Sequence, residues 1–142
     1  MAEIIYQLTE YTDMPHQARI EWLTEADMTK MNEHLVLAGQ KQRNDNWLRE
    51  IYQKGIARYC LLYHDGFPIA RGAVEPYSEE AWEAADIRTA KAYRSNGFAK
   101  EILRFLSRYI IEYGKIATCR TEEDNTAMQK VIKSLEYKEI EQ

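Results

Sequence analysis

Cysteine is scarce in this chain, and long apolar runs are absent. The two cysteines, Cys60 and Cys119, stand in short apolar runs typical of strands. We expect buried thiols there rather than a disulfide or a pair of metal ligands. No apolar run reaches the ~18 residues that a membrane-spanning helix needs. The sequence therefore predicts neither a disulfide framework nor a membrane partner.

Histidine and positive charge are also in short supply. The three histidines, His16, His34 and His64, have no metal-ligand spacing, so we expect no metal site. The formal net charge of −4 argues against a general nucleic-acid binder, so nucleic acid is not an expected partner. The N-terminal residues lack the basic segment and apolar core of a signal peptide, and we expect a cytoplasmic protein.

What the chain does contain is an ordinary globular composition, with 45% apolar and 30% charged residues. Its 142 residues suit one domain with a sizeable core. No linker, repeat or low-complexity segment interrupts it. We therefore treat residues 1–142 as a single domain.

Apolar periodicity and turn residues predict an alternation of strands and helices. The expected elements are, in order, the strand Glu3–Thr9, the helices His16–Leu37 and Gln42–Lys54, the strands Ala57–His64, Phe67–Glu75 and Ala81–Thr89, the helix Phe98–Tyr113, the strand Lys115–Arg120, a helix capped by Asp124 or Asn125, and a short strand Tyr137–Ile140. Asp65-Gly66 is a hairpin turn signal. The unit from Ala81 to Arg120 is expected to be a right-handed parallel crossover.

The most informative segment joins the strand Ala81–Thr89 to the helix Phe98–Tyr113. It is a short loop with one glycine, Gly97, and it opens directly into a strongly amphipathic helix. Free N–H groups at a helix N-terminus bind anions. Positive charge gathers around this loop, at Arg88, Lys91, Arg94 and Lys100. The segment therefore predicts a site for a phosphate-bearing ligand.

The loop and the element order resemble the GCN5-related N-acetyltransferase (GNAT) family over most of the chain. The family motif Arg/Gln-x-x-Gly-x-Gly/Ala corresponds to Arg94-Ser-Asn-Gly97-Phe-Ala99, with the favoured aromatic residue at Tyr93. The asparagine that opens the family's last helix corresponds to Asn125. The resemblance implies an α/β, single-domain GNAT-like fold, with a mixed central sheet of about six strands flanked by about four helices and a right-handed βαβ crossover at the CoA site.

The resemblance further implies acetyl-CoA as co-substrate, no metal, and transfer of an acetyl group to a primary amine by direct attack in a ternary complex. The acceptor would be a small-molecule or peptide amine, and a homodimer is one open arrangement. Backbone groups from Ser95 to Ala99 would wrap the pyrophosphate, and the strand end Ile87-Arg88-Thr89 would pair with the pantetheine arm. The implied cofactor-binding residues are Ile87, Arg88, Thr89, Arg94, Ser95, Asn96, Gly97, Phe98, Ala99 and Asn125.

Three features depart from the family pattern. Ile132 stands where many members have a tyrosine that protonates the leaving thiolate, and we expect Ile132 to pack in the core beside the thiol end of the cofactor. Glu136 replaces the glycine of the family's Gly-Phe pair. The sequence after Tyr137 leaves little room for the family's seventh strand. These departures keep a second reading open, a catalytically degenerate module that binds or senses acyl-CoA; a third is an interaction domain whose loop binds anions.

A base must remove a proton from the acceptor, because an alkylammonium has a pKa near ~10. Glu83 is the candidate, since regular alternation along its strand puts it on the same side as Ile87. Glu75 and Asp86 are alternatives. For each of them an exposed carboxylate without a catalytic role is the competing interpretation.

Overall fold

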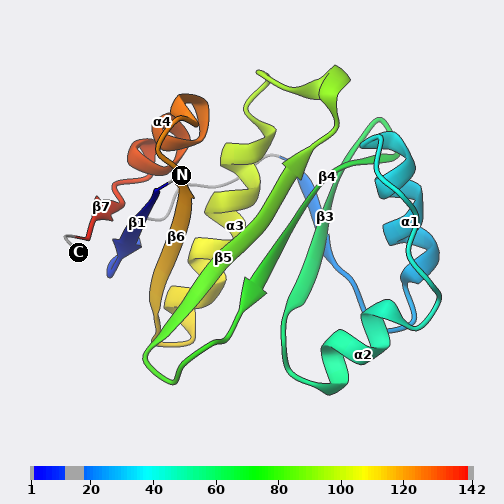
Figure 1. Ribbon diagram of the computed structural model, residues 1–142, viewed down its shortest axis with the longest axis horizontal. Helices are drawn as coiled ribbons and strands as arrows, with labels where there is room; N and C mark the ends of the chain where they lie inside the picture. Colours follow the sequence, from blue (N-terminus) through cyan, green and yellow to red (C-terminus); the bar gives the residue numbers. More distant parts are fainter. Residues whose placement is uncertain (1, 12–17, 141–142) are drawn as a thin grey trace.

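One mixed sheet of seven strands forms the centre of the protein (Figure 1). The computed structural model describes residues 2–11 and 18–140. The strands lie in the order β2-β3-β4-β5-β6-β1-β7. Their bounds are β1 Glu3–Leu8, β2 Arg19–Trp22, β3 Arg58–His64, β4 Phe67–Glu75, β5 Ala81–Thr89, β6 Ile116–Glu122 and β7 Lys138–Glu139. The pair β5–β6 is parallel and the other described pairs are antiparallel, as the predicted crossover requires.

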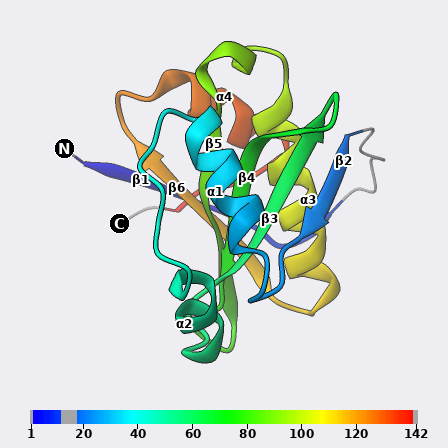
Figure 2. The same cartoon turned by 90° about the vertical axis from the view of Figure 1, so that its right-hand side faces the viewer.

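Helices cover both faces of the sheet (Figures 1 and 2). Helices α3 Phe98–Glu112 and α4 Thr126–Ser134 lie on one face, and α1 Met28–Leu37 and α2 Trp47–Gln53 lie on the other. Each face has its own apolar core, which we call the α3-side core and the α1-side core. The α3-side core includes Ile102, Leu106 and Ile132, and the α1-side core includes Met31, Leu35 and Leu48. The predicted α/β class and the four helices are confirmed.

The predicted helix His16–Leu37 is wrong in its first part. Residues 12–17, which include His16, lie outside the described residues, and Arg19–Trp22 forms strand β2, paired antiparallel with β3. The ring of Trp22 packs beneath the Arg58 guanidinium, at 4.3 Å, and against the α3-side core. Sheet pairing and burial of this ring outweigh the local helical periodicity. The second predicted helix is also shorter than expected, since α2 spans Trp47–Gln53.

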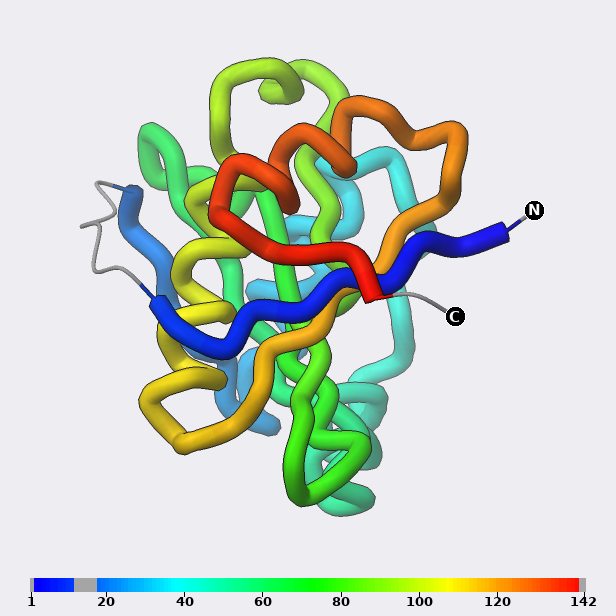
Figure 3. The backbone as a smooth tube through the Cα atoms, turned by 90° about the vertical axis from the view of Figure 1, so that its left-hand side faces the viewer, coloured from blue at the N-terminus to red at the C-terminus, as the bar shows by residue number. Residues whose placement is uncertain are grey.

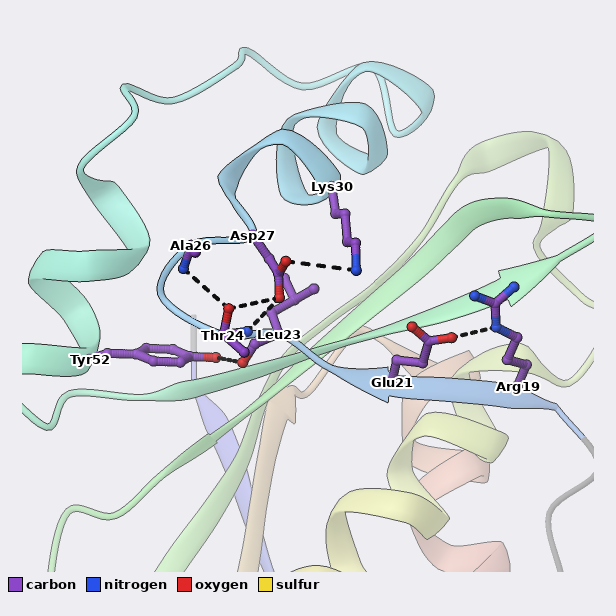
Figure 4. A network of polar contacts seen from close by, with 8 residues as sticks. All are labelled: Arg19, Glu21, Leu23, Thr24, Ala26, Asp27, Lys30 and Tyr52. Atoms are coloured by element: carbon purple, nitrogen blue, oxygen red, sulfur yellow. Dashed lines mark hydrogen bonds and ion pairs between the residues drawn. The ribbon is translucent and has the colours of Figure 1, made fainter.

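Polar contacts stabilise the connection between β2 and α1 (Figure 4). The backbone N–H and the hydroxyl of Thr24 donate to the Asp27 carboxylate, at 2.7 and 3.0 Å, and Ala26 N donates to the Thr24 hydroxyl. From α2, the Tyr52 hydroxyl donates to the Leu23 carbonyl at 2.6 Å. This connection therefore holds α1 and α2 together, and α1 begins at Met28.

The N-terminal strand lies beside both C-terminal strands (Figure 3). β1 pairs with β6 along its whole length, and it pairs with β7 through Tyr6↔Glu139 and Gln7↔Lys138. The predicted last strand is present but shorter than Tyr137–Ile140. The sheet has one strand more than expected because β2 was predicted as helix. The edge of β6 that faces away from β5 is covered by β1.

The remaining elements follow the sequence closely. β4 and β5 have the predicted bounds, and Asp65 and Gly66 adopt φ +52° and +83°, as a tight hairpin turn requires. Gly72 of β4 permits a close approach of α3 to the sheet. A Cβ atom at this position would lie 2.5 Å from Ile102 Cγ2 and 2.9 Å from Leu106 Cδ1.

We predict that Gly72→Ala lowers the free energy of unfolding by about 1–3 kcal/mol, because an added methyl group overpacks the α3-side core. Urea denaturation measures this change. In an Ile102→Ala background the same substitution should cost less, because the nearest clashing atom is gone. Equal stability of Gly72→Ala and the parent protein would show that α3 moves away freely.

Candidate active site

Strands β5 and β6 pair at one end only. Their parallel register covers Ala81↔Ile116, Trp82↔Ala117 and Glu83↔Thr118, and beyond it the strands separate (Figure 1). On its other edge, β5 stays paired with β4 as far as Thr89↔Ala70. In the described sheet, the β6-facing edge of β5 after Glu83 therefore has no strand partner. An extended ligand can add to such an edge as a strand does.

A tight loop joins the unpaired end of β5 to α3. It contains the short 3-10 turn Lys91–Tyr93, and Ser95 and Gly97 adopt φ +67° and +83°. Within the described part of the chain, the N–H groups of Ser95, Asn96 and Gly97 donate no hydrogen bond. α3 begins at the next residue and is 15 residues long. Free N–H groups at the positive end of such a helix are the arrangement that binds phosphate in proteins.

Two loop side chains shape this segment from within. Arg94 Nε donates to the Thr89 carbonyl at 3.1 Å, and Asn96 Nδ2 donates to the carbonyls of Tyr93 and Arg94, each at 3.1 Å. The ring of Phe98 packs against His64, with the centroids 5.1 Å apart. The loop is therefore braced by side chains, while its backbone N–H groups stay available to a ligand.

Thr89 carries a buried hydroxyl without a partner. The residue is 8% exposed, and its Oγ1 forms no hydrogen bond in the described part of the chain. Buried hydroxyls almost always have a partner. The unpaired Oγ1 lies at the end of β5, beside the loop, where a polar ligand could supply its missing hydrogen bond. The preceding residue, Arg88, is exposed and carries a positive charge.

A β-bulge in β5 separates Glu83 from Ile87. Ala85 lies opposite Ala73 and Arg88 opposite Arg71, so Asp86 and Ile87 together face Gly72. The prediction that Glu83 and Ile87 share a side is wrong, because the extra residue shifts the alternation by one. Ile87 packs against the α3-side core, and Glu83 faces the opposite side of the sheet.

Glu83 stands where β5 and β6 part. It is 7% exposed, and its two carboxylate oxygens accept hydrogen bonds from Arg120 Nε of β6, at 2.9 and 3.1 Å. The hydrogen bond and the charge of Glu83 raise the pKa of Arg120. The candidate base is therefore at the opening between the strands, and it is held in an ion pair.

Glu75 of β4 lies directly opposite Glu83 across the β4–β5 pair. Burial, followed by the negative charges of Glu83 and Asp86, raises the pKa of Glu75. Among the described residues, none donates a hydrogen bond to the Glu75 carboxylate or forms an ion pair with it. The α1 side of the sheet thus presents one paired and one unpaired carboxylate side by side.

The third candidate, Asp86, is engaged by two strands. Arg71 of β4 donates to it through Nε, at 3.2 Å, and through Nη2, at 3.0 Å. The Tyr59 hydroxyl of β3 donates to the same carboxylate at 2.8 Å. Arg71 also donates through Nη1 to Gln40 Oε1 at 2.5 Å. Asp86 is therefore an anchor within the protein. The sequence does not reveal this network, because its members come from separate elements with no local pattern.

His34 of α1 completes this network. Its Nδ1 lies 2.9 Å from the Pro68 carbonyl and its Nε2 lies 3.2 Å from Arg71 Nη1, so the ring donates to Pro68 and accepts from Arg71 as a neutral imidazole. Burial, with a further contribution from the Arg71 charge, lowers the pKa of His34 to about 4. His34 thus has a structural role, linking α1 to β4 through the Pro68 carbonyl and Arg71.

Comparison with known proteins identifies the fold. The model of the acetyltransferase (GNAT) family matches residues 17–137. The chain belongs to the GNAT acetyltransferase family. A search of curated protein sequences finds no match.

Solved structures with the same fold include several GNAT proteins. A putative GNAT acetyltransferase from Novosphingobium aromaticivorans has a TM-score of 0.72 at 16% identity and covers 97% of this chain and 59% of its own. A GNAT acetyltransferase from Colwellia psychrerythraea has a TM-score of 0.75 at 22% identity, with 96% and 52% covered. AAC(6')-Iy, in complex with a bisubstrate analogue of CoA and acetylneamine, has a TM-score of 0.70 at 18% identity, with 89% and 94% covered. This chain thus spans little more than half the length of the first two.

The GNAT-specific positions on α4 behave as their residue types suggest. Asn125 caps α4, because its Oδ1 accepts from Met128 N at 3.1 Å, and this arrangement leaves Nδ2 available to a ligand. Ile132 is fully buried in the α3-side core, so its predicted packing in the core is confirmed, and its place beside the thiol end of the cofactor stays a prediction. The nearby Tyr137 hydroxyl pairs with Ser107 Oγ at 2.6 Å. The described helix α4 contains no tyrosine that could stand in for the one that many family members have at the position of Ile132.

The described residues contain no group of three or more His, Cys, Asp or Glu side chains that could hold a metal ion. None of the described helices is long and apolar enough to cross a membrane. Cys60 and Cys119 are free and buried, as predicted, and burial raises the pKa of each thiol to about 12.

We predict that His34 makes the protein less stable in acid. The unfolded chain takes up a proton at His34 near pH ~6.5, whereas the folded protein resists protonation until the pH reaches about 4. The unfolded state binds more protons in this window, so the free energy of unfolding falls as the pH drops through it. The full effect is about 3 kcal/mol.

Urea unfolding at several pH values measures this loss. In His34→Gln the slope against pH should be smaller, and in His64→Gln, which changes an exposed histidine, it should match the parent. Identical slopes for the parent protein and His34→Gln would contradict the prediction.

Proposed function

We propose that this protein transfers an acetyl group from acetyl-CoA to a primary amine of a small-molecule or peptide acceptor. The observation that carries the proposal is the loop Arg94–Ala99, whose free N–H groups lie at the start of α3 and beside the unpaired edge of β5. Family membership supports it. The similarity to AAC(6')-Iy, whose complex holds a CoA-linked analogue, supports a CoA-dependent transfer as well.

The chain offers a separate group for each part of the co-substrate. The N–H groups of Ser95 to Ala99 and the dipole of α3 suit the pyrophosphate. The backbone of Ile87–Thr89, together with the Thr89 hydroxyl, suits the amides of the pantetheine arm. The Asn125 amide can reach the same arm from α4. Positive charge at Arg88 adds long-range attraction in a protein whose net charge is −4.

In the proposed reaction, an ammonium group of the acceptor first loses a proton to a carboxylate, directly or through water. The free amine then attacks the thioester carbonyl, the new C–N bond forms, and the C–S bond breaks. A thiol has a pKa of ~8.5, so the thiolate leaves near neutral pH and takes a proton from water, while the attacking nitrogen gives its second proton to water as the amide forms. No tyrosine at position 132 is required for this step.

Glu83 is the proposed base, because it stands at the opening between β5 and β6. Glu75, directly across from it, is the alternative, because its pKa is raised by burial and by its carboxylate neighbours. Both lie on the side of the sheet that α1 and α2 cover in part, where the acceptor would approach. A module that binds acyl-CoA without turnover remains the second candidate function, and Ile132 is the observation that favours it.

We predict that Gly97→Val weakens CoA binding by at least about tenfold, a cost of about 1.4 kcal/mol. Valine is strained at φ +83°, so the loop must rebuild and its N–H groups turn away. Gly114→Val is a matched control at the other end of α3, since Gly114 has φ +76° and similar open space. Isothermal titration should show normal CoA binding for the control. Normal binding by Gly97→Val would contradict the assigned loop.

We predict that Glu83→Gln lowers kcat by about 10²–10⁴, the usual contribution of a general base, while the Kd for CoA stays the same. Thiol release from acetyl-CoA with a panel of amines measures kcat, and Glu75→Gln is the matched variant across the strand pair. A loss in Glu75→Gln alone would move the base to β4. CoA binding by the parent protein without thiol release for any amine would favour the binding module.

A further inference from the structure

The bulge in β5 decides how the strand meets the co-substrate. Up to Glu83, β5 pairs with both neighbours; after the bulge, Arg88 and Thr89 pair with β4 alone. A shift of one residue in a strand exchanges the two sides of every later residue. The position of the bulge therefore fixes which N–H and C=O groups of Ile87–Thr89 point into the opening.

The backbone conformation of the bulge costs free energy that another contact must offset. Asp86 has φ +49°, a left-handed conformation that side chains other than glycine adopt at some cost, although aspartate tolerates it better than most residues do. No glycine stands at this place in β5 to relieve the strain. A contact to the Asp86 side chain must therefore stabilise the bulged conformation against a regular strand.

The restraint is a buried arginine on the neighbouring strand. The Arg71 side chain is 5% exposed and that of Asp86 is 36% exposed. Their bidentate contact fixes the orientation of the carboxylate as well as its distance. Tyr59 donates a third hydrogen bond to Asp86, and Arg71 is itself held by His34 and Gln40. Strands β3 and β4 thus converge on one carboxylate, and helix α1 and the segment after it hold the arginine that binds it.

We propose that Arg71 and Asp86 are positioning residues for acetyl-CoA, since their ion pair holds the β5 bulge and thereby aims the backbone of Ile87–Thr89 at the pantetheine arm. This inference rests on the proposed function. Neither side chain needs to touch the co-substrate. Asp86 lies on the α1 side of the sheet and acts by setting the backbone conformation of β5.

The test is a double variant, Arg71→Met with Asp86→Ala. It leaves no unpaired buried charge, so the fold is expected to survive, while alanine keeps the cost of positive φ and the bulge loses its restraint. We expect the Kd for CoA to rise by at least about tenfold, because the displaced backbone of Ile87–Thr89 can no longer hydrogen-bond the pantetheine arm. The KM for acetyl-CoA should rise with it, while the KM for the amine changes little.

Asp86→Asn serves as the conservative variant. Asparagine tolerates the same backbone conformation and keeps an acceptor oxygen for Arg71, so it should retain most of the CoA affinity. Ile110→Val is the control for lost stability, because Ile110 is buried in the α3-side core, on the other face of the sheet from the network. It should lower stability and leave CoA binding unchanged.

The outcomes separate the two ideas. If the parent protein does not bind CoA, the proposed function fails. If the parent binds CoA and the folded double variant binds it within about twofold, a difference of about 0.4 kcal/mol, the positioning role is overturned. An equal loss in Asp86→Asn and the double variant also overturns it, because the charge and not the geometry would then matter. If the double variant does not fold, Arg71→Lys decides, because lysine keeps the charge but cannot make the bidentate contact: weakened CoA binding supports the role, and unchanged binding refutes it.

Discussion

The organisation of the molecule depends on one strand, β5, that pairs fully on one edge and briefly on the other. Pairing with β4 extends to Thr89, whereas pairing with β6 ends at Glu83. Because β6 diverges, the backbone of β5 is left with hydrogen-bonding groups that no strand satisfies, and unpaired groups in a sheet interior require another partner. α3 then starts beside this edge, so its positive end and the unpaired backbone lie at the same opening. A ligand with an anionic end and an amide-containing arm satisfies both.

The two ends of the opening beside β5 differ in charge. Toward the loop, the groups available to a ligand are the free N–H groups at the positive end of α3. Toward α1, they are the carboxylates of Glu75 and Glu83, one unpaired and one held by Arg120. An anionic co-substrate would therefore approach through the positive end of the opening, and a cationic acceptor would approach through the negative end. Arg71 neutralises Asp86, so this third carboxylate does not raise the negative charge of the acceptor side further.

Much of this arrangement was predictable because it is local. The Asp65-Gly66 turn, the bounds of β4 and β5, the loop before α3 and the Asn125 cap each depend on a few adjacent residues. Strand β2 was missed because its identity depends on pairing with β3 and on burial of Trp22. The bulge was missed because Asp86 and Ile87 alternate like any strand residues. Its cause, Arg71, is fifteen residues away in the chain, and only the fold brings the two together.

The buried ion pair is better explained by conformational specificity than by stability. Removing charges from water costs about as much as their attraction returns, so an apolar pair of similar size is often as stable. A regular β5 with an apolar side chain at position 86 would bury more surface without strain at φ +49°. The chain instead places Asp86 at the bulge and surrounds it with donors from β3 and β4. In a regular β5 the buried Arg71 guanidinium would have no carboxylate partner. The free-energy cost of this unpaired charge excludes the strand register without the bulge. Electrostatics thus selects the conformation of β5, while apolar packing on both faces supplies the stability.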